Sequence, residues 1–249
     1  MRLEQRALRF QCGGNALIGI VDVPERPLAR GLLMLADSGQ YRTGSHRQFT
    51  LLARLLAGRG VAVMRFDRAG AGDSEGRGCD QAGGADIAGA MNEFFIHVPE
   101  MKESVILAAG DAAGAAATYA AADPRVAGLA LFNPELAQAA PSAGSLALRA
   151  IGSYAPPLLR RHLPALRRGL GMRAPALAPE LASAFDSYEG HILLVLAGGT
   201  AGSEHGARLL EARRTRCRRV EIPGADGDFS RSAWREAVAA ASASWLTSW

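Results

Sequence analysis

Residues 105–117 contain the residue types of a turn that presents a reactive side chain. Three large apolar residues lead into alanine and glycine, and a run of alanine with good helix propensity follows. This pattern predicts a buried strand that breaks sharply into a helix, with small residues where the backbone is crowded. Many hydrolytic enzymes hold a nucleophile in a strained position on such a turn. Here the centre of the turn is Gly110, which has no side chain to react.

Asp111 is the neighbouring side chain that is best placed to replace the missing nucleophile. If the pattern is shifted by one residue, Asp111 lies between small residues, and carboxylates are established nucleophiles. The simpler alternative is that Asp111 caps the following helix and complements its dipole. Ser38 is a weaker candidate, for which an ordinary turn residue is the simpler interpretation.

The ligand-forming residues do not indicate a metal or cofactor site. Histidine, aspartate and glutamate do not cluster at metal-ligand spacing. The cysteines, Cys12, Cys79 and Cys217, are far apart and lack a CxxC pattern, which argues against a zinc site and a disulfide framework. We therefore expect no metal and no other cofactor.

The composition is that of an ordinary globular protein. The chain has 249 residues, of which 49% are hydrophobic and 21% charged, enough for one large domain with a sizeable core. A net charge of +4 is mild, and nucleic-acid binding usually needs a clustered basic face. There is neither a signal-peptide core nor an apolar run of membrane-spanning length. We expect a cytoplasmic protein with no nucleic-acid partner and no membrane span. A small-molecule ligand, a protein partner and a homo-oligomer all remain open.

Alternating strand and helix patterns position the turn at Gly110. Residues 7–12 and 16–23 predict a hairpin, and residues 31–132 alternate strands with helices. This alternation indicates an α/β fold with a mostly parallel, doubly wound sheet. Residues 135–188 interrupt it and predict a helical cap inserted into a single domain that spans residues 1–249. Two further strands follow, at 192–196 and 218–222, each with a helix after it.

The loop after the predicted strand at residues 31–36 contains the polar side chains that could line a ligand pocket. They are Ser38, Gln40, Tyr41, Arg42 and His46. His46 could instead bond locally in the first turn of the next helix, which Ser45 is expected to cap. Further along, Asp67 and Arg68 are expected to form a structural ion pair.

Several motifs together are specific in their order and spacing. They are Gln40-Tyr-Arg-Thr-Gly-Ser-His-Arg-Gln-Phe49, Arg65-Phe-Asp-Arg-Ala-Gly-Ala-Gly-Asp-Ser-Glu-Gly76 and Asp123-Pro-Arg-Val-Ala-Gly-Leu-Ala-Leu-Phe-Asn-Pro134, with further similarity at residues 185–198 and 233–249. In these motifs the chain resembles the α/β hydrolases associated with exosortase A systems, in their type 1 group. The resemblance covers nearly the whole chain and is weakest in the cap. It implies an α/β-hydrolase fold and a bacterial setting near exopolysaccharide and protein-sorting loci, whereas the name hydrolase rests largely on the fold.

The resemblance also implies where a catalytic triad would stand. The nucleophile, acid and histidine positions correspond to Gly110, Thr200 and Gly227, so all three side chains are replaced. An intact triad is worth on the order of 10⁶ in rate, whereas binding and the oxyanion hole alone retain about 10³–10⁴ over water. We therefore predict a non-catalytic binding or accessory protein. The alternative is an active hydrolase of small esters or thioesters with a relocated nucleophile such as Asp111.

Overall fold

The computed structural model describes residues 3–37, 39–76, 84–136, 177–198, 201–213 and 216–249. The chain divides into two compact units, one formed by Met1–Leu136 with Glu180–Trp249 and the other by Ala137–Pro179. Most of the predicted cap at residues 135–188 lies outside the described residues, apart from α7 (Pro179–Ser187) and its flanks. A single domain with a helical cap therefore stays a prediction.

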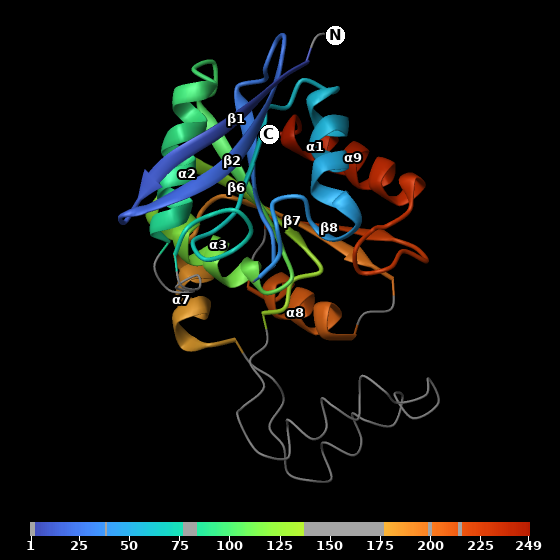
Figure 1. Ribbon diagram of the computed structural model, residues 1–249. Coiled ribbons are helices and arrows are strands. Elements are labelled where there is room, and N and C mark those ends of the chain that lie inside the picture. The colour runs from blue at the N-terminus through green and yellow to red at the C-terminus, as the bar shows by residue number, and fades with distance from the viewer. Residues whose placement is uncertain (1–2, 38, 77–83, 137–176, 199–200, 214–215) are drawn as a thin grey trace. The chain divides into compact units, whose positions relative to one another are not determined.

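The larger unit is built on an eight-stranded sheet with the strand order β1-β2-β4-β3-β5-β6-β7-β8 (Figure 1). The strands are β1 (Leu3–Cys12), β2 (Asn15–Pro24), β3 (Arg30–Leu35), β4 (Val63–Phe66), β5 (Glu103–Ala109), β6 (Val126–Phe132), β7 (His191–Ala197) and β8 (Cys217–Ile222). The β1–β2 hairpin is antiparallel, as is the β2–β4 pair, and the remaining pairs are parallel. This confirms the predicted hairpin and the mostly parallel sheet.

Helices cover both faces of the sheet because its central strands are apolar on both sides. The helices are α1 (Gln48–Ala57), α2 (Ala85–His97), α3 (Ala112–Ala122), α7 (Pro179–Ser187), α8 (Ala201–Glu211) and α9 (Ser232–Leu246). Helices α1 and α9 pack side by side on one face, and α2 and α3 pack on the other (Figure 1). In β3, Leu32 and Met34 belong to the core under α1 and α9, and the alternate residues are equally buried. The doubly wound arrangement is therefore as predicted.

The start of α1 differs from the prediction. Ser45 does not cap this helix, because a 3₁₀ turn, η1 (Ser45–Arg47), precedes it. His46 and Arg47 have positive φ angles of 50° and 57°, which break the helical path before Gln48. The Ser45 hydroxyl lies 3.3 Å from the Gln40 side-chain oxygen, to which it donates. This contact ties the loop after β3 to the turn before α1.

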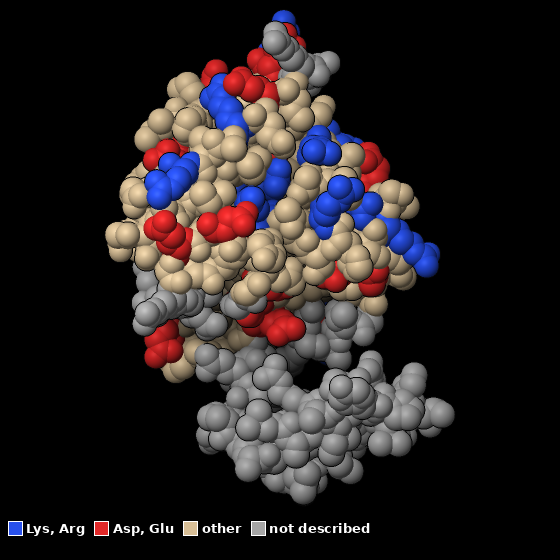
Figure 2. All heavy atoms as spheres, viewed as in Figure 1, with Lys and Arg blue, Asp and Glu red and all other residues tan. Residues whose placement is uncertain are grey.

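Charged side chains of both signs are interspersed on the face of the molecule shown in Figure 2. Exposed ion pairs among the described residues include Arg213 with Asp186 at 2.8 Å. Pairs of this kind contribute little to stability. Within the described ranges, none of the helices has the length and apolar character needed to cross a bilayer.

Candidate functional site

The turn between β5 and α3 has the sharp geometry that the sequence predicts. Gly110 has a φ of +49°, a conformation that glycine adopts without a steric penalty. Its N–H donates to the carbonyl of Phe132 at 3.0 Å, and its own carbonyl accepts from the N–H of Glu135 at 2.9 Å. These bonds tie the turn to the end of β6, the neighbouring strand. The backbone is therefore held as it would be to present a side chain.

Asp37 occupies the space into which a side chain at this turn would project. A Cβ atom added to Gly110 would lie 2.0 Å from Oδ1 of Asp37, far closer than atoms can approach. Asp37 follows β3, which is paired in parallel with β5, so the carboxyl ends of these two strands lie at the same edge of the sheet. Asp37 is not among the predicted site residues. Its position directly after a buried strand, at the edge where the turn was expected, is the signal that could have identified it.

The surroundings of Asp37 raise its pKa to about 6, chiefly through burial and then through the negative charges of Asp111, Glu135 and Asp228. The main-chain N–H of Asp111 donates to this carboxylate and opposes the rise. Oδ2 also accepts from the Gln40 side chain at 3.3 Å. The buried Oδ1 has no hydrogen-bond partner among the described residues. Asp37 can therefore exchange a proton near neutral pH.

A cavity of about 250 Å³ opens beside Asp37 and Gly110 at the carboxyl edge of the sheet. The described residues that line it are Asp37, Gln48, Phe49, Ala109, Gly110, Phe132, Asn133, Glu135, Gly227, Asp228 and Phe229. Two of the three predicted triad positions, Gly110 and Gly227, thus lie at one cavity. Thr200, the third position, lies outside the described residues.

Gly227 faces free space, in contrast to Gly110. A Cβ atom added there would meet nothing within 4 Å. Its loop is held by Asn133, whose Nδ2 donates to the Gly227 carbonyl at 2.8 Å. The Asn133 side-chain oxygen accepts from the N–H of Ala197 at 2.7 Å, at the end of β7. Asn133 therefore joins three loops around the cavity, a role that the sequence indicates only by an asparagine at a strand end before proline.

Asp111 lies beside the turn but is exposed and is not one of the described lining residues. It occupies the N-cap position of α3, and its side chain makes no capping hydrogen bond. The alternative prediction, that the Asp111 side chain caps α3, is therefore wrong. Its main-chain N–H, which binds Asp37, is the part of the residue that reaches the site.

The predicted pocket residues of the β3–α1 loop are divided by the structure. Gln40 contacts Asp37, whereas the side chain of Tyr41 is 55% exposed and His46 is also exposed. Neither Tyr41 nor His46 is among the described residues that line the cavity. Ser38 lies outside the described residues. Ligand contacts by Tyr41, Arg42 and His46 stay predictions.

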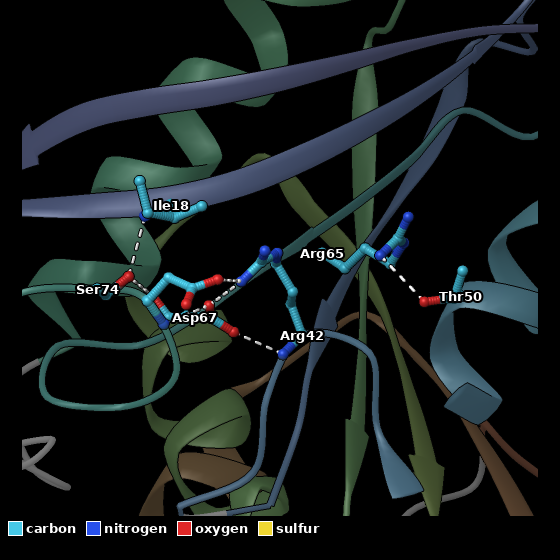
Figure 3. A network of polar contacts seen from close by, with 7 residues as sticks. Ile18, Arg42, Thr50, Arg65, Asp67 and Ser74 are labelled. Carbon is cyan, nitrogen blue, oxygen red and sulfur yellow. Dashed lines mark hydrogen bonds and ion pairs between the residues drawn. The ribbon is translucent and has the colours of Figure 1, made fainter. Parts of the chain in front are cut away.

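Arg42 joins a polar network below the loop (Figure 3). Its guanidinium pairs with the fully buried carboxylate of Asp67 and, at 2.8 Å, with Asp73. Its main-chain N–H also donates to Asp67, at 2.6 Å. Arg68 instead pairs with Asp86 at 2.8 Å, so the predicted pair between Asp67 and Arg68 is wrong. Consecutive residues at the end of a strand point to opposite sides and find different partners.

The described residues contain no group of three or more His, Cys, Asp or Glu side chains placed to hold a metal ion. What the site offers chemically is a half-buried carboxylate of raised pKa, a main-chain donor bound to it, and an apolar floor of phenylalanine rings.

The mostly parallel sheet, its two helical layers and the turn at Gly110 define an α/β-hydrolase fold. Solved structures with this fold align over almost the entire chain. Dienelactone hydrolase from Anabaena variabilis is 18% identical, with a TM-score of 0.67 and coverage of 99% of this chain and 98% of that one. The esterase Pf2001 from Pyrococcus furiosus is 12% identical, with a TM-score of 0.71 and coverage of 99% and 92%. The esterase domain of a Rhodothermus marinus protein is 20% identical, with a TM-score of 0.66 and coverage of 98% of each chain.

The chain belongs to the serine aminopeptidase S33 family, whose model matches residues 42–183. The matched segment includes the turn at Gly110. No curated protein matches the chain significantly. The structural similarity shows the fold, and at these low identities it shows the fold alone. The family match places the chain among the α/β hydrolases.

Proposed function

We propose that this protein is a binding or accessory protein that uses the α/β-hydrolase fold without the standard catalytic triad. The observation that carries the proposal is the carboxylate of Asp37 in the space that a nucleophile at position 110 would need. The sequence resemblance further suggests a bacterial process linked to exopolysaccharide or exosortase-dependent sorting.

The position of Asp37 obstructs hydrolysis in a second way. In this fold the main-chain N–H after the nucleophile normally stabilises the oxyanion that forms during acyl transfer. Here that N–H belongs to Asp111 and donates to the Asp37 carboxylate. Loss of one oxyanion donor costs about 10²–10³ in rate, and loss of the triad on the order of 10⁶. A negative charge at the same place would also repel the developing oxyanion.

The cavity nevertheless keeps the features of a binding site. It is concave, with an apolar floor and a few polar groups, which is typical of small-ligand pockets. Asn133 ties the Gly227 loop to the end of β7 by two hydrogen bonds, which supports a preformed cavity. Binding without turnover is the function that this combination supports best.

Hydrolysis through a relocated nucleophile such as Asp111 has weaker support. A carboxylate nucleophile must reach the substrate at about 3–3.5 Å, and Asp111 is an exposed residue outside the described cavity lining. The name of the family implies a serine enzyme, whereas position 110 is glycine.

Turnover of short p-nitrophenyl esters and thioesters, together with labelling by a fluorophosphonate, tests the proposal. We expect no labelling and no saturable turnover, with Asp111→Asn indistinguishable from the wild type. An active esterase of the same fold serves as the positive control. Saturable turnover that Asp111→Asn abolishes would instead establish the relocated nucleophile.

A further inference from the structure

The charged side chains that line the cavity, among the described residues, are all acidic. Three of the described lining residues, Asp37, Glu135 and Asp228, are acidic, and none of the described lining residues is Lys, Arg or His. Asp111 adds a further negative charge near Asp37. Negative charges that face one another in a partly closed space favour a positively charged occupant.

One polar atom at the cavity lacks a partner within the described part of the chain. Oδ1 of Asp37 is buried and has no hydrogen-bond partner there. Buried polar groups are normally hydrogen-bonded, so this acceptor indicates a ligand that supplies an N–H donor. Gln48 also lines the cavity and is only 8% exposed, and its side-chain amide can contribute a second acceptor.

The rest of the cavity indicates the body of such a ligand. Phe49, Phe132 and Phe229 line it, and the rings of Phe132 and Phe229 meet edge to face at 5.9 Å between centroids. Aromatic rings combined with carboxylates are suited to organic ammonium groups, which the rings attract through their π-faces. A volume of about 250 Å³ lies below the roughly 300–1,000 Å³ of pockets for drug-sized ligands, so the ligand is small.

We propose that the cavity binds a small primary amine in its protonated form. The ammonium group donates to the Asp37 carboxylate and the Gln48 side-chain oxygen, and the apolar body packs on the phenylalanine rings. This inference rests on the proposed function, since it names the ligand class of the same site.

Three ligands of one shape test the proposal: benzylammonium, benzyl alcohol and benzoate, which carry a positive, a neutral and a negative head group. Binding to the wild-type protein is measured at pH 8 by protein-observed NMR titration. We expect benzylammonium to bind about tenfold or more tightly than benzyl alcohol, because a hydrogen bond to a charged group is stronger than a neutral one. Benzoate should bind most weakly.

Two variants separate the site from general charge effects. Asp37→Asn should weaken benzylammonium about tenfold and leave benzyl alcohol unchanged, and the exposed Glu135→Gln should weaken it less. Asp186→Asn, a matched change in an exposed pair outside the cavity lining, should have no effect. Equal binding of the three ligands, no binding at all, tighter binding of benzoate, or an unchanged preference in Asp37→Asn would overturn the inference. None of these results depends on turnover, so the proposed function stands or falls separately by the ester and labelling assays.

Discussion

The substitution Gly110→Ala is the most direct test of how Asp37 and the turn fit together. The three atoms nearest to a Cβ at position 110 all belong to the Asp37 carboxyl group, at 2.0, 2.8 and 3.2 Å. The new methyl group must therefore expel this carboxylate, and alanine must also adopt the positive φ of the turn. Removal of the carboxyl group by Asp37→Ala takes away all three clashing atoms and leaves only the backbone strain.

The expected cost has two parts. A non-glycine residue in the left-handed conformation costs roughly 1–2 kcal/mol. Rotation of Asp37 adds a rotamer cost of about 0.5–1.5 kcal/mol and loses its bond from the Asp111 N–H, which the better hydration of the carboxylate partly offsets. We expect Gly110→Ala to lower the free energy of unfolding by about 2–4 kcal/mol in the wild type and by only about 1–2 kcal/mol in the Asp37→Ala background.

The measurement is urea unfolding at pH 8, followed by tryptophan fluorescence, for the wild type, both single variants and the double variant. Gly227→Ala is the matched control, because a methyl group there meets nothing within 4 Å and the residue does not have a positive φ. It should change stability by less than about 0.5 kcal/mol. The packing of Asp37 against the turn would be refuted if Gly110→Ala cost the same in the wild type and in the Asp37→Ala background. It would also be refuted if Gly227→Ala cost as much as Gly110→Ala in the wild type.

Three further predictions concern the groups around the cavity. Because the Asp37 pKa is raised from 3.8 to about 6, the folded protein holds this proton where the unfolded chain loses it. The contribution of Asp37 to stability should therefore fall as the pH rises from about 4 to about 6, so the wild type should lose stability relative to Asp37→Asn in urea titrations across that range. Asn133→Ala leaves the buried N–H of Ala197 without its acceptor and should cost about 1–3 kcal/mol in thermal unfolding, whereas no loss would contradict its bridging role. Arg42→Ala leaves Asp67 buried without its cation and should cost about 3–5 kcal/mol, against less than about 1 kcal/mol for the exposed Arg213→Ala.

Most of the sheet was predictable because its central strands are continuous apolar runs. The strands β3 and β7 lie within one residue of their expected places, since burial on both faces leaves little ambiguity in the sequence. The first strand is longer than predicted. Its first half is exposed and lacks an apolar pattern, yet its backbone pairs with β2 as far as Leu3. Pairing of this kind depends on the partner strand and leaves no periodicity to detect.

The site was predictable only where it is local. The turn at Gly110 follows from residues that are adjacent in sequence, and its geometry is present. The role of Asp37 depends on the register of β3 against β5, in which Leu35 lies opposite Ala108. The partners of Arg42 and Arg68 likewise come from distant parts of the chain, a strand end for Arg42 and the first turn of α2 for Arg68. Spacing along one chain segment cannot specify which of several polar side chains fills a space formed by two strands.

The two glycines at the cavity differ in what they imply for catalysis. Position 227 is open, because a Cβ atom added there would meet nothing within 4 Å. Position 110 is not open, because Asp37 fills the space and binds the N–H that an oxyanion would need. A side chain introduced at position 110 would therefore need Asp37 to move or to be replaced. Asp37 and Gly110 are complementary in shape, and a carboxylate in this place is better suited to hold a cation than to stabilise an anionic transition state.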